Sequence, residues 1–178
     1  MSATAALIAS TLNAGTPLLL AGIGILIHER SGVLNLGIEG IMLMGAVAGF
    51  GTCYLTGSFF LGFAAAALVG MVLSALFGFL TLGLYANQNA AGLAMAIFGA
   101  GLAAFIGQPL QGVSLAARAS EGIPFLRDIP FVGDAFFSSH VLVYVALFMA
   151  GAVACFLYKS RWGLILRAAG ESPKSAYA

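Results

Sequence analysis

Residues Gly40–Ala117 read GIMLMGAVAGFGTCYLTGSFFLGFAAAALVGMVLSALFGFLTLGLYANQNAAGLAMAIFGAGLAAFIGQPLQGVSLAA, and none of these 78 residues is Asp, Glu, Lys, Arg or His. A water-soluble domain needs charged side chains at short intervals, since about a quarter of its residues are charged. A helix crosses a hydrocarbon core of roughly 30 Å with about 20 mostly apolar residues, so this stretch has room for three or four crossings. The sequence therefore predicts an integral membrane protein.

The composition of the whole chain of 178 residues supports the same class. Only 7% of the residues are charged and the mean hydropathy is +1.06. The formal net charge of +1 and the absence of a large basic patch argue against a nucleic-acid partner. Cys53 and Cys155 both lie in apolar stretches, so we expect two small buried hydrophobic residues rather than a disulfide.

We predict an all-α, polytopic transmembrane helix bundle, because unpaired backbone groups in lipid cost several kcal/mol each. The five expected spans are Ala5–Ile27, Ile38–Leu55, Phe59–Tyr85, Ala90–Gln108 and Ser139–Tyr158. Residues 1–27 contain no Lys or Arg, which indicates a retained first span and not a cleavable signal. Pro17 is expected to kink this span.

The distribution of basic residues predicts the orientation in the membrane. Four of them follow Tyr158: Lys159, Arg161, Arg167 and Lys174. The loop Pro109–Ser138 carries two basic and three acidic residues. Since Lys and Arg collect in cytoplasmic loops, we expect the C-terminal stretch and the His28–Gly37 junction inside, and the 109–138 loop and the N-terminus outside.

Small residues recur four positions apart in the predicted spans. The pairs are Gly45 with Gly49, Ala66 with Gly70, and Gly99 with Ala103. Such spacings let helix backbones approach closely in lipid. They also arise by chance in a glycine-rich sequence, and nothing in them requires homodimerisation.

The most unusual local sequence is HERSGVLNLGIEG (His28–Gly40), which places charges between two apolar helices. Gly32 and Gly37 allow sharp turns, Asn35 can cap the following helix, and Glu39 would lie near the positive end of that helix dipole. Ionisable groups at membrane depth are costly, so two interpretations stand. The segment is an interfacial turn among headgroups, or an interrupted helix that lines a substrate path.

Two further polar segments each allow two interpretations. Asn87-Gln88-Asn89 is a short turn between spans, or it presents one amide to a pore. The stretch Lys159–Ala178 is basic and amphipathic, and Ser172 followed by Pro173 predicts the start of a short cytoplasmic helix. This stretch is a tail on headgroups, or a docking helix for a cytoplasmic partner.

The chain lacks the common motifs of nucleotide and metal chemistry. It contains no GxxxxGK[ST], HExxH or CxxC sequence, and His28 and His140 stand far apart. We therefore expect no enzyme, no metal site and no cofactor bound by this chain.

Two segments resemble a known family. ERSGVLNLGIEGIMLMGA (Glu29–Ala46) resembles a signature of bacterial ABC-transporter permeases for nucleosides and simple sugars, within the ribose and branched-chain amino-acid permease superfamily. RWGLILRAAGESPKSA (Arg161–Ala176) is similar to the cytoplasmic coupling loop of these permeases.

The resemblance implies a multi-pass permease subunit of an ATP-driven importer in the bacterial plasma (inner) membrane, for nucleosides or a related sugar-containing solute. Its implied partners are a second permease subunit, a cytoplasmic ATPase subunit that uses the ATP, an extracytoplasmic solute-binding protein and membrane lipid. Carried over by position, the coupling element comprises Gly163, Arg167, Gly170, Glu171 and Pro173. The signature residues near the translocation path are Glu29, Arg30, Asn35 and Glu39, which touch substrate or only fix the helix geometry.

Permeases of this kind continue with further spans after the coupling loop. We therefore expect residues 1–178 to form a single transmembrane permease domain that is incomplete at its C-terminus, with residues 159–178 as the coupling segment. Two other functions remain possible from the residues alone. One is an ion-coupled secondary transporter with its ion site at Glu29 or Glu39, and the other is a non-transporting membrane scaffold.

Overall fold

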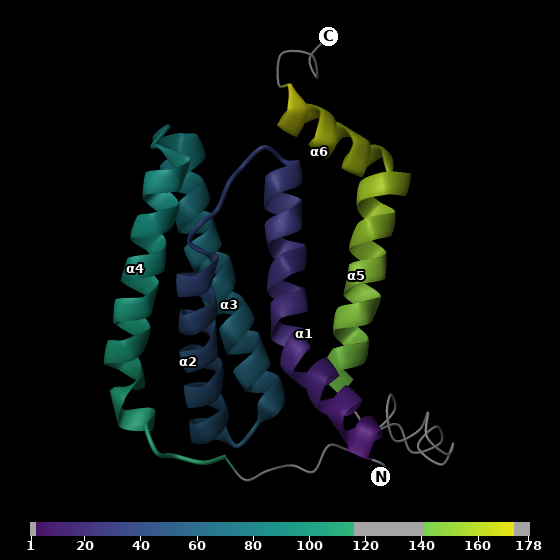
Figure 1. Ribbon diagram of the computed structural model, residues 1–178. Helices are drawn as coiled ribbons and strands as arrows, with labels where there is room; N and C mark the ends of the chain where they lie inside the picture. The colour runs from purple at the N-terminus through teal and green to yellow at the C-terminus, as the bar shows by residue number, and fades with distance from the viewer. Residues whose placement is uncertain (1–2, 116–140, 173–178) are drawn as a thin grey trace. The chain divides into compact units, whose positions relative to one another are not determined.

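The computed structural model of the chain describes residues 3–115 and 141–172 (Figure 1). The elements in chain order are α1 (Ala3–Arg30), α2 (Ile38–Thr56), α3 (Phe59–Gly78), the π-helical η1 (Phe79–Gly83), α4 (Gln88–Gly107), the 3₁₀ turn η2 (Gln108–Leu110), α5 (Val141–Lys159) and α6 (Arg161–Glu171). Every regular element within these residues is helical, which confirms the all-α class.

Five helical segments of the described chain are long and apolar enough to cross a membrane. They are Leu7–Arg30, Ile38–Thr56, Phe59–Gly83, Gln88–Leu110 and Leu142–Lys159. The five predicted spans are thus confirmed, with small differences at their ends. The first helix runs past Ile27 to Arg30, because His28 and Arg30 can sit favourably in its last turn beside the negative end of the helix dipole.

The chain divides into two compact units, each described by itself. The first unit comprises Met1–Gly32 and Ala116–Ala178, and so contains α1, α5 and α6. The second unit is Val33–Leu115, with α2, α3, η1, α4 and η2. That the chain forms one permease domain stays a prediction.

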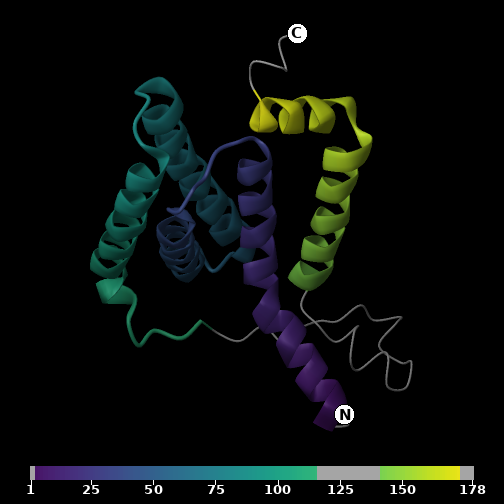
Figure 2. The same cartoon turned by 45° about the horizontal axis from the view of Figure 1, so that its top comes forward.

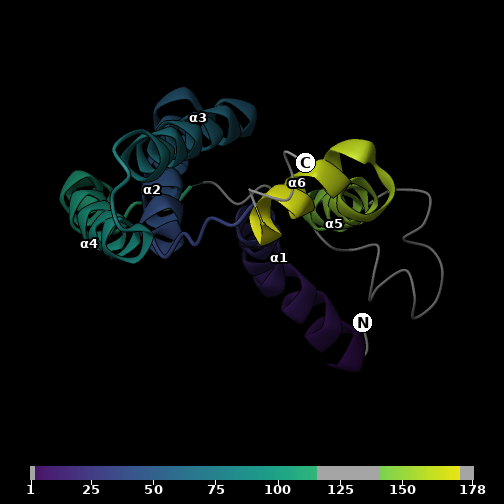
Figure 3. The ribbon, with the colours of Figure 1, turned by 90° about the horizontal axis from the view of Figure 1, so that it is seen from above.

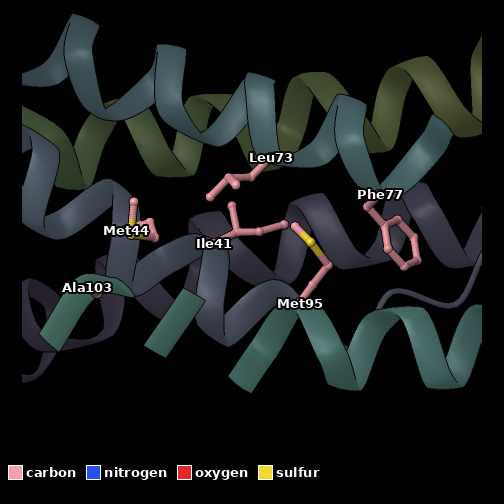
Figure 4. Close-up of a cluster of buried hydrophobic side chains, with 6 residues drawn as sticks. All are labelled: Ile41, Met44, Leu73, Phe77, Met95 and Ala103. Carbon is pink, nitrogen blue, oxygen red and sulfur yellow. The ribbon is translucent and has the colours of Figure 1, made fainter. Parts of the chain in front are cut away.

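In the second unit, α2 lies between α3 and α4 (Figure 3). Its buried apolar cluster draws side chains from all three helices (Figure 4): Ile41, Met44, Leu73, Phe77, Met95 and Ala103. Burial of apolar side chains gives these helices little reason to associate in a membrane, because lipid tails are as apolar as a protein neighbour. Close backbone approach is therefore the feature that holds these helices together.

Glycines provide this close approach on two faces of α2. On the α3 side, a Cβ added to Gly49 would lie 3.2 Å from the Ala66 Cβ, and one added to Gly62 would lie 2.8 Å from the Gly49 carbonyl oxygen. On the α4 side, a Cβ added to Gly99 would lie only 2.6 Å from the Gly40 Cα. Gly49 and Gly99, which the spacings predicted, thus do lie at helix contacts, and Gly40 and Gly62 are their structural partners.

Between α3 and α4 the backbone leaves the regular α-helical conformation at two places. The last turn of α3 passes into the π-helical η1, where Thr81 Oγ1 donates to the carbonyl of Phe77 at 2.9 Å. Tyr85 then adopts a left-handed conformation with φ 54°, and α4 begins after Asn87. The fourth span therefore starts at Gln88, slightly before the predicted Ala90.

In the first unit, α1 bends partway along its length (Figure 2). Pro17 lies inside the helix, where its ring interrupts the hydrogen-bond ladder, and this accounts for the predicted kink. Beside it, the buried Thr16 donates its hydroxyl to the carbonyl of Leu12 at 2.7 Å. α5 packs against α1 and buries Val143, Ala146 and Leu157.

The two cysteines differ in environment. Cys53 of α2 is buried beside Gly62, as predicted, whereas Cys155 of α5 is exposed, and both are free thiols. The prediction was wrong for Cys155 because α5 turns the face with Ala146 and Leu157 inward, and Cys155 lies on the other face. An apolar sequence neighbourhood in a membrane helix does not say which face is covered by protein.

Large apolar side chains cover the outside of the described helices. Leu55 and Phe60, for example, are 82% and 81% exposed. A soluble monomer rarely exposes extensive apolar surface, so lipid or further protein must cover these faces.

Candidate functional site

One side chain forms hydrogen bonds to both α5 and α6 at the link between these helices. Ser160 is the N-cap of α6, and its Oγ accepts a hydrogen bond from the Gly163 N–H at 2.9 Å. The same hydroxyl donates to the Phe156 carbonyl at 2.7 Å. One hydroxyl thus satisfies a donor at the start of α6 and an acceptor at the end of α5.

α6 ends at the point where the predicted helix of the C-terminal stretch would begin. Ser172 was expected to start a helix, but in the structure it is the C-cap of α6, with its N–H bonded to the carbonyl of Ala168 at 3.0 Å. Pro173, and any helix that begins there, lies outside the described residues. Sequence reasoning missed Ser160, although it has the same N-cap chemistry as Ser172 and stands directly before Arg161.

α6 has two different faces. The face toward α1 and α5 carries Gly163, Leu166, Arg167 and Gly170, which are spaced as one side of a helix and are buried or half-buried. Trp162, Leu164 and Ile165 remain exposed at 73%, 60% and 57%. Figure 1 shows α6 in yellow, running from the end of α5 across to the end of α1.

The first half of α6 rests on the last turns of α5. A Cβ added to Gly163 would overlap the Phe156 carbonyl oxygen and lie 2.7 Å from the Leu157 Cα. The Arg167 guanidinium lies over the Tyr158 ring, 5.0 Å from its centroid, a cation–π contact. Gly163 and Arg167, two of the residues assigned to the coupling element, therefore fix α6 to the span that precedes it.

The second half of α6 rests on the end of α1. A Cβ added to Gly170 would overlap the Arg30 carbonyl oxygen and lie 2.8 Å from the Gly32 nitrogen. Gly32 itself has φ +81°, the left-handed conformation that commonly ends a helix at glycine. The Gly32 Cβ position would in turn lie 3.0 Å from the Gly170 Cα, so the two backbones touch directly.

The signature segment (Glu29–Ala46) begins in the first unit and continues in the second. Glu29 and Arg30 belong to the last turn of α1, and both side chains are exposed. After Gly32 the chain enters the second unit, where the Leu34 N–H donates to Oε1 of Gln88 at 2.9 Å. The polar turn before α4 thus has structural roles: Gln88 binds the signature backbone, and Asn87 caps α4 by accepting from two N–H groups at 3.0 and 3.2 Å.

Asn35 has a different role from the one predicted. The N-cap of α2 is Gly37, which has no side-chain cap, and the buried Asn35 accepts from the Gly37 N–H at 2.8 Å. Asn35 lies too early in the chain to reach the first N–H groups of α2, so it closes a turn before the helix instead. A Cβ on Gly37 would lie 2.8 Å from that of Met95, so Gly37 is required for space and not for a left-handed turn.

The predicted site residues therefore fall into separate groups. Gly163, Arg167, Gly170 and Glu171 share α6, and the structure brings Gly170 onto the backbone of Arg30. Glu39 is exposed in the first turn of α2. Within the described residues, no group of three or more His, Cys, Asp or Glu side chains is placed to hold a metal ion.

The fold and this arrangement define a multi-pass α-helical membrane protein in which an amphipathic helix, fixed to two spans, follows the last described span. The chain belongs to the family described as branched-chain amino acid transport system / permease component, whose model matches residues 7–178.

Three relatives have names that specify a transported solute. The chain is 42% identical over 180 residues to a provisionally named glucose ABC transporter permease protein of Haloferax volcanii, covering 99% of this chain. It is 32% identical to a nucleoside ABC transporter permease protein of Lactococcus lactis and 34% identical to a guanosine ABC transporter permease protein of Bacillus subtilis, each covering 96% of this chain. The match spans only 55% of the first relative and 57% of the other two. No solved structure matches the chain.

Proposed function

We propose that this chain is part of the permease subunit of an ATP-driven ABC importer for nucleosides or a related sugar-containing solute. Family membership supports the permease assignment. The named relatives support the solute class, because glucose is a sugar and guanosine and other nucleosides contain one. The five apolar spans and the permease family support placement in a plasma membrane, which we take to be bacterial.

The observation that carries the proposal is the arrangement of α6. Its inward face is fixed to α5 and α1, while Trp162, Leu164 and Ile165 are left exposed. A helix held in this way presents a rigid apolar surface, of the kind that inserts into a groove of a partner. The partner that fits is a cytoplasmic ATPase subunit, since this chain has no phosphate-binding loop of its own.

In the proposed mechanism this chain is not an enzyme and binds no cofactor. ATP binding and hydrolysis occur in the ATPase subunits, which move α6 and with it the attached spans. A second permease subunit completes the pathway, and an extracytoplasmic solute-binding protein delivers the solute. The ATPase can shift the equilibrium between two conformations of the permease only by the difference in its binding free energy for them. The surface that α6 offers to the ATPase must therefore differ between the two conformations.

The docking surface can be tested by placing a charge on it. The permease subunit that carries this sequence would be co-produced with its cognate ABC ATPase and the complex purified in detergent. We expect Ile165→Asp to weaken the ATPase association at least about tenfold, equivalent to about 1.4 kcal/mol, because an unpaired carboxylate would be buried at the contact. Ile165→Val keeps the apolar surface and serves as the control, with association unchanged.

Equal ATPase association for Ile165→Asp and the unmodified protein would contradict the docking role. That result would favour the other interpretation of this basic, amphipathic stretch, in which it lies on lipid headgroups.

A further inference from the structure

The two segments that resemble permease motifs meet at one contact inside the first unit. Gly32, in the signature segment, and Gly170, in the coupling segment, touch through their main chains without an intervening side chain. The neighbouring Arg30 contributes its carbonyl oxygen to this contact, whereas its side chain is exposed.

A contact between two backbones is mechanically stiff. Side chains can absorb a displacement by changing rotamer, but main-chain atoms within a helix, such as those of Arg30 and Gly170, have no such freedom. α6 is also fixed at its other end, where Gly163 lies against the backbone of Phe156 and Leu157. A push on the exposed face of α6 must therefore reach the ends of both α5 and α1.

The residues that directly follow Gly32 are held by contacts with α4. Only Val33 separates Gly32 from Leu34, whose N–H is bonded to Gln88 at the start of α4. Leu36 is held next, because a Cβ on Gly92 of α4 would lie 2.8 Å from the Leu36 nitrogen. The segment that follows Gly32 in the chain is thus attached to α4 from Leu34 onward.

We propose that the Gly32–Gly170 contact is the joint through which α6 moves α1 and the signature segment. Gly32 and Gly170 are then positioning residues, and the signature segment transmits motion through its backbone. This inference rests on the proposed function, because it requires an ATPase that moves α6.

The joint is tested by separating ATP hydrolysis from uptake. The permease carrying Gly170→Ala would be reconstituted in vesicles with its ATPase and solute-binding protein. The added methyl group forces the two backbones apart, while the exposed face of α6 is unchanged. We expect the ATPase to associate and hydrolyse ATP as before, and the uptake per ATP to fall about tenfold, within the range of known coupling energies.

Gly24→Ala in α1 and Gly151→Ala in α5 are matched controls, since a Cβ at either position meets nothing within 4 Å. Both should keep the normal uptake per ATP. A second variant acts on the far side of the joint: Gln88→Ala removes the acceptor of the Leu34 N–H and should also lower the uptake per ATP, whereas Gln88→Glu keeps an acceptor and should restore it. This variant leaves α6 intact, so it tests the transmission of motion beyond Gly32 even where Gly170→Ala does not assemble.

Normal uptake per ATP in Gly170→Ala and Gln88→Ala would overturn the inference. Proportional loss of ATPase association, hydrolysis and uptake in Gly170→Ala would also overturn it, because Gly170 would then only support docking. Failure of the unmodified protein to bind the ATPase or to use ATP for uptake would refute the proposed function, which is a different result.

Discussion

At the scale of single residues, glycine has two distinct physical roles in this chain. Gly32 needs its freedom to adopt a positive φ, which L side chains rarely do. Gly40, Gly99 and Gly170 need only the missing Cβ, because another backbone occupies that space. Both roles look alike in the sequence, so the spacing rule could identify Gly99 but could not identify its partner Gly40.

Asn87 offers a test at this scale. Its side chain accepts hydrogen bonds from the N–H groups of Asn89 and Ala90, which otherwise have no partner in the first turn of α4. Asn87→Ala should lower the stability by about 1 kcal/mol. Thermal unfolding of the purified protein in detergent measures the change, and Asn89→Ala, at an exposed position two residues later, should have a much smaller effect. Equal shifts for both variants would contradict the capping role.

At the scale of helices, α2 organises its unit by presenting small residues on two sides. Gly49 faces Gly62 and Ala66 of α3, and Gly40 faces α4. These contacts matter because lipid offers apolar side chains nearly the same environment as protein. Tight backbone packing therefore selects one arrangement of the three helices.

Gly40→Ala tests this packing. A methyl group at Gly40 would overlap the Met95 carbonyl and lie 2.9 Å from the Ala96 Cα, so α2 and α4 must separate. We expect a loss of about 1–3 kcal/mol in stability, the usual range for overpacking. Gly101→Ala in α4 is the control, because its Cβ meets nothing within 4 Å and alanine is the better helix former. Equal stability of Gly40→Ala and Gly101→Ala, measured by thermal unfolding in detergent, would contradict the packing argument.

At the scale of the whole molecule, the described chain combines five apolar spans with one amphipathic helix and no phosphate-binding loop in its sequence. This combination is the one expected of the permease subunit proposed above. The rival, an ion-coupled transporter with Glu29 or Glu39 as its ion site, needs no such partner.

Uptake into vesicles distinguishes the two functions. The permease would be reconstituted with its ATPase, and a radiolabelled nucleoside or sugar supplied outside. We expect uptake to require both ATP and the solute-binding protein, and to continue when an ionophore removes the pH and sodium gradients. Uptake driven by either gradient without ATP would establish the ion-coupled function instead.

The candidate site was only partly accessible to prediction. The helix predicted to begin at Ser172 falls outside the described residues and stays a prediction, whereas α6, which begins after Ser160, was missed although both serines have N-cap chemistry. Asn35 was assigned a cap of α2, yet it accepts from the N–H of Gly37, which precedes the first helical residue. Whether the side chains of Glu29, Arg30, Asn35 and Glu39 contact solute stays a prediction.

The amino-acid sequence by itself determined the membrane class, the number of spans and the kink at Pro17. These depend on hydropathy and backbone chemistry summed over neighbouring residues, which the chain carries in any conformation. Only the tertiary structure decided that Gly170 lies on Gly32 and that Gln88 holds Leu34. Contacts between residues so far apart in the chain depend on how helix surfaces fit, and no local pattern encodes that fit.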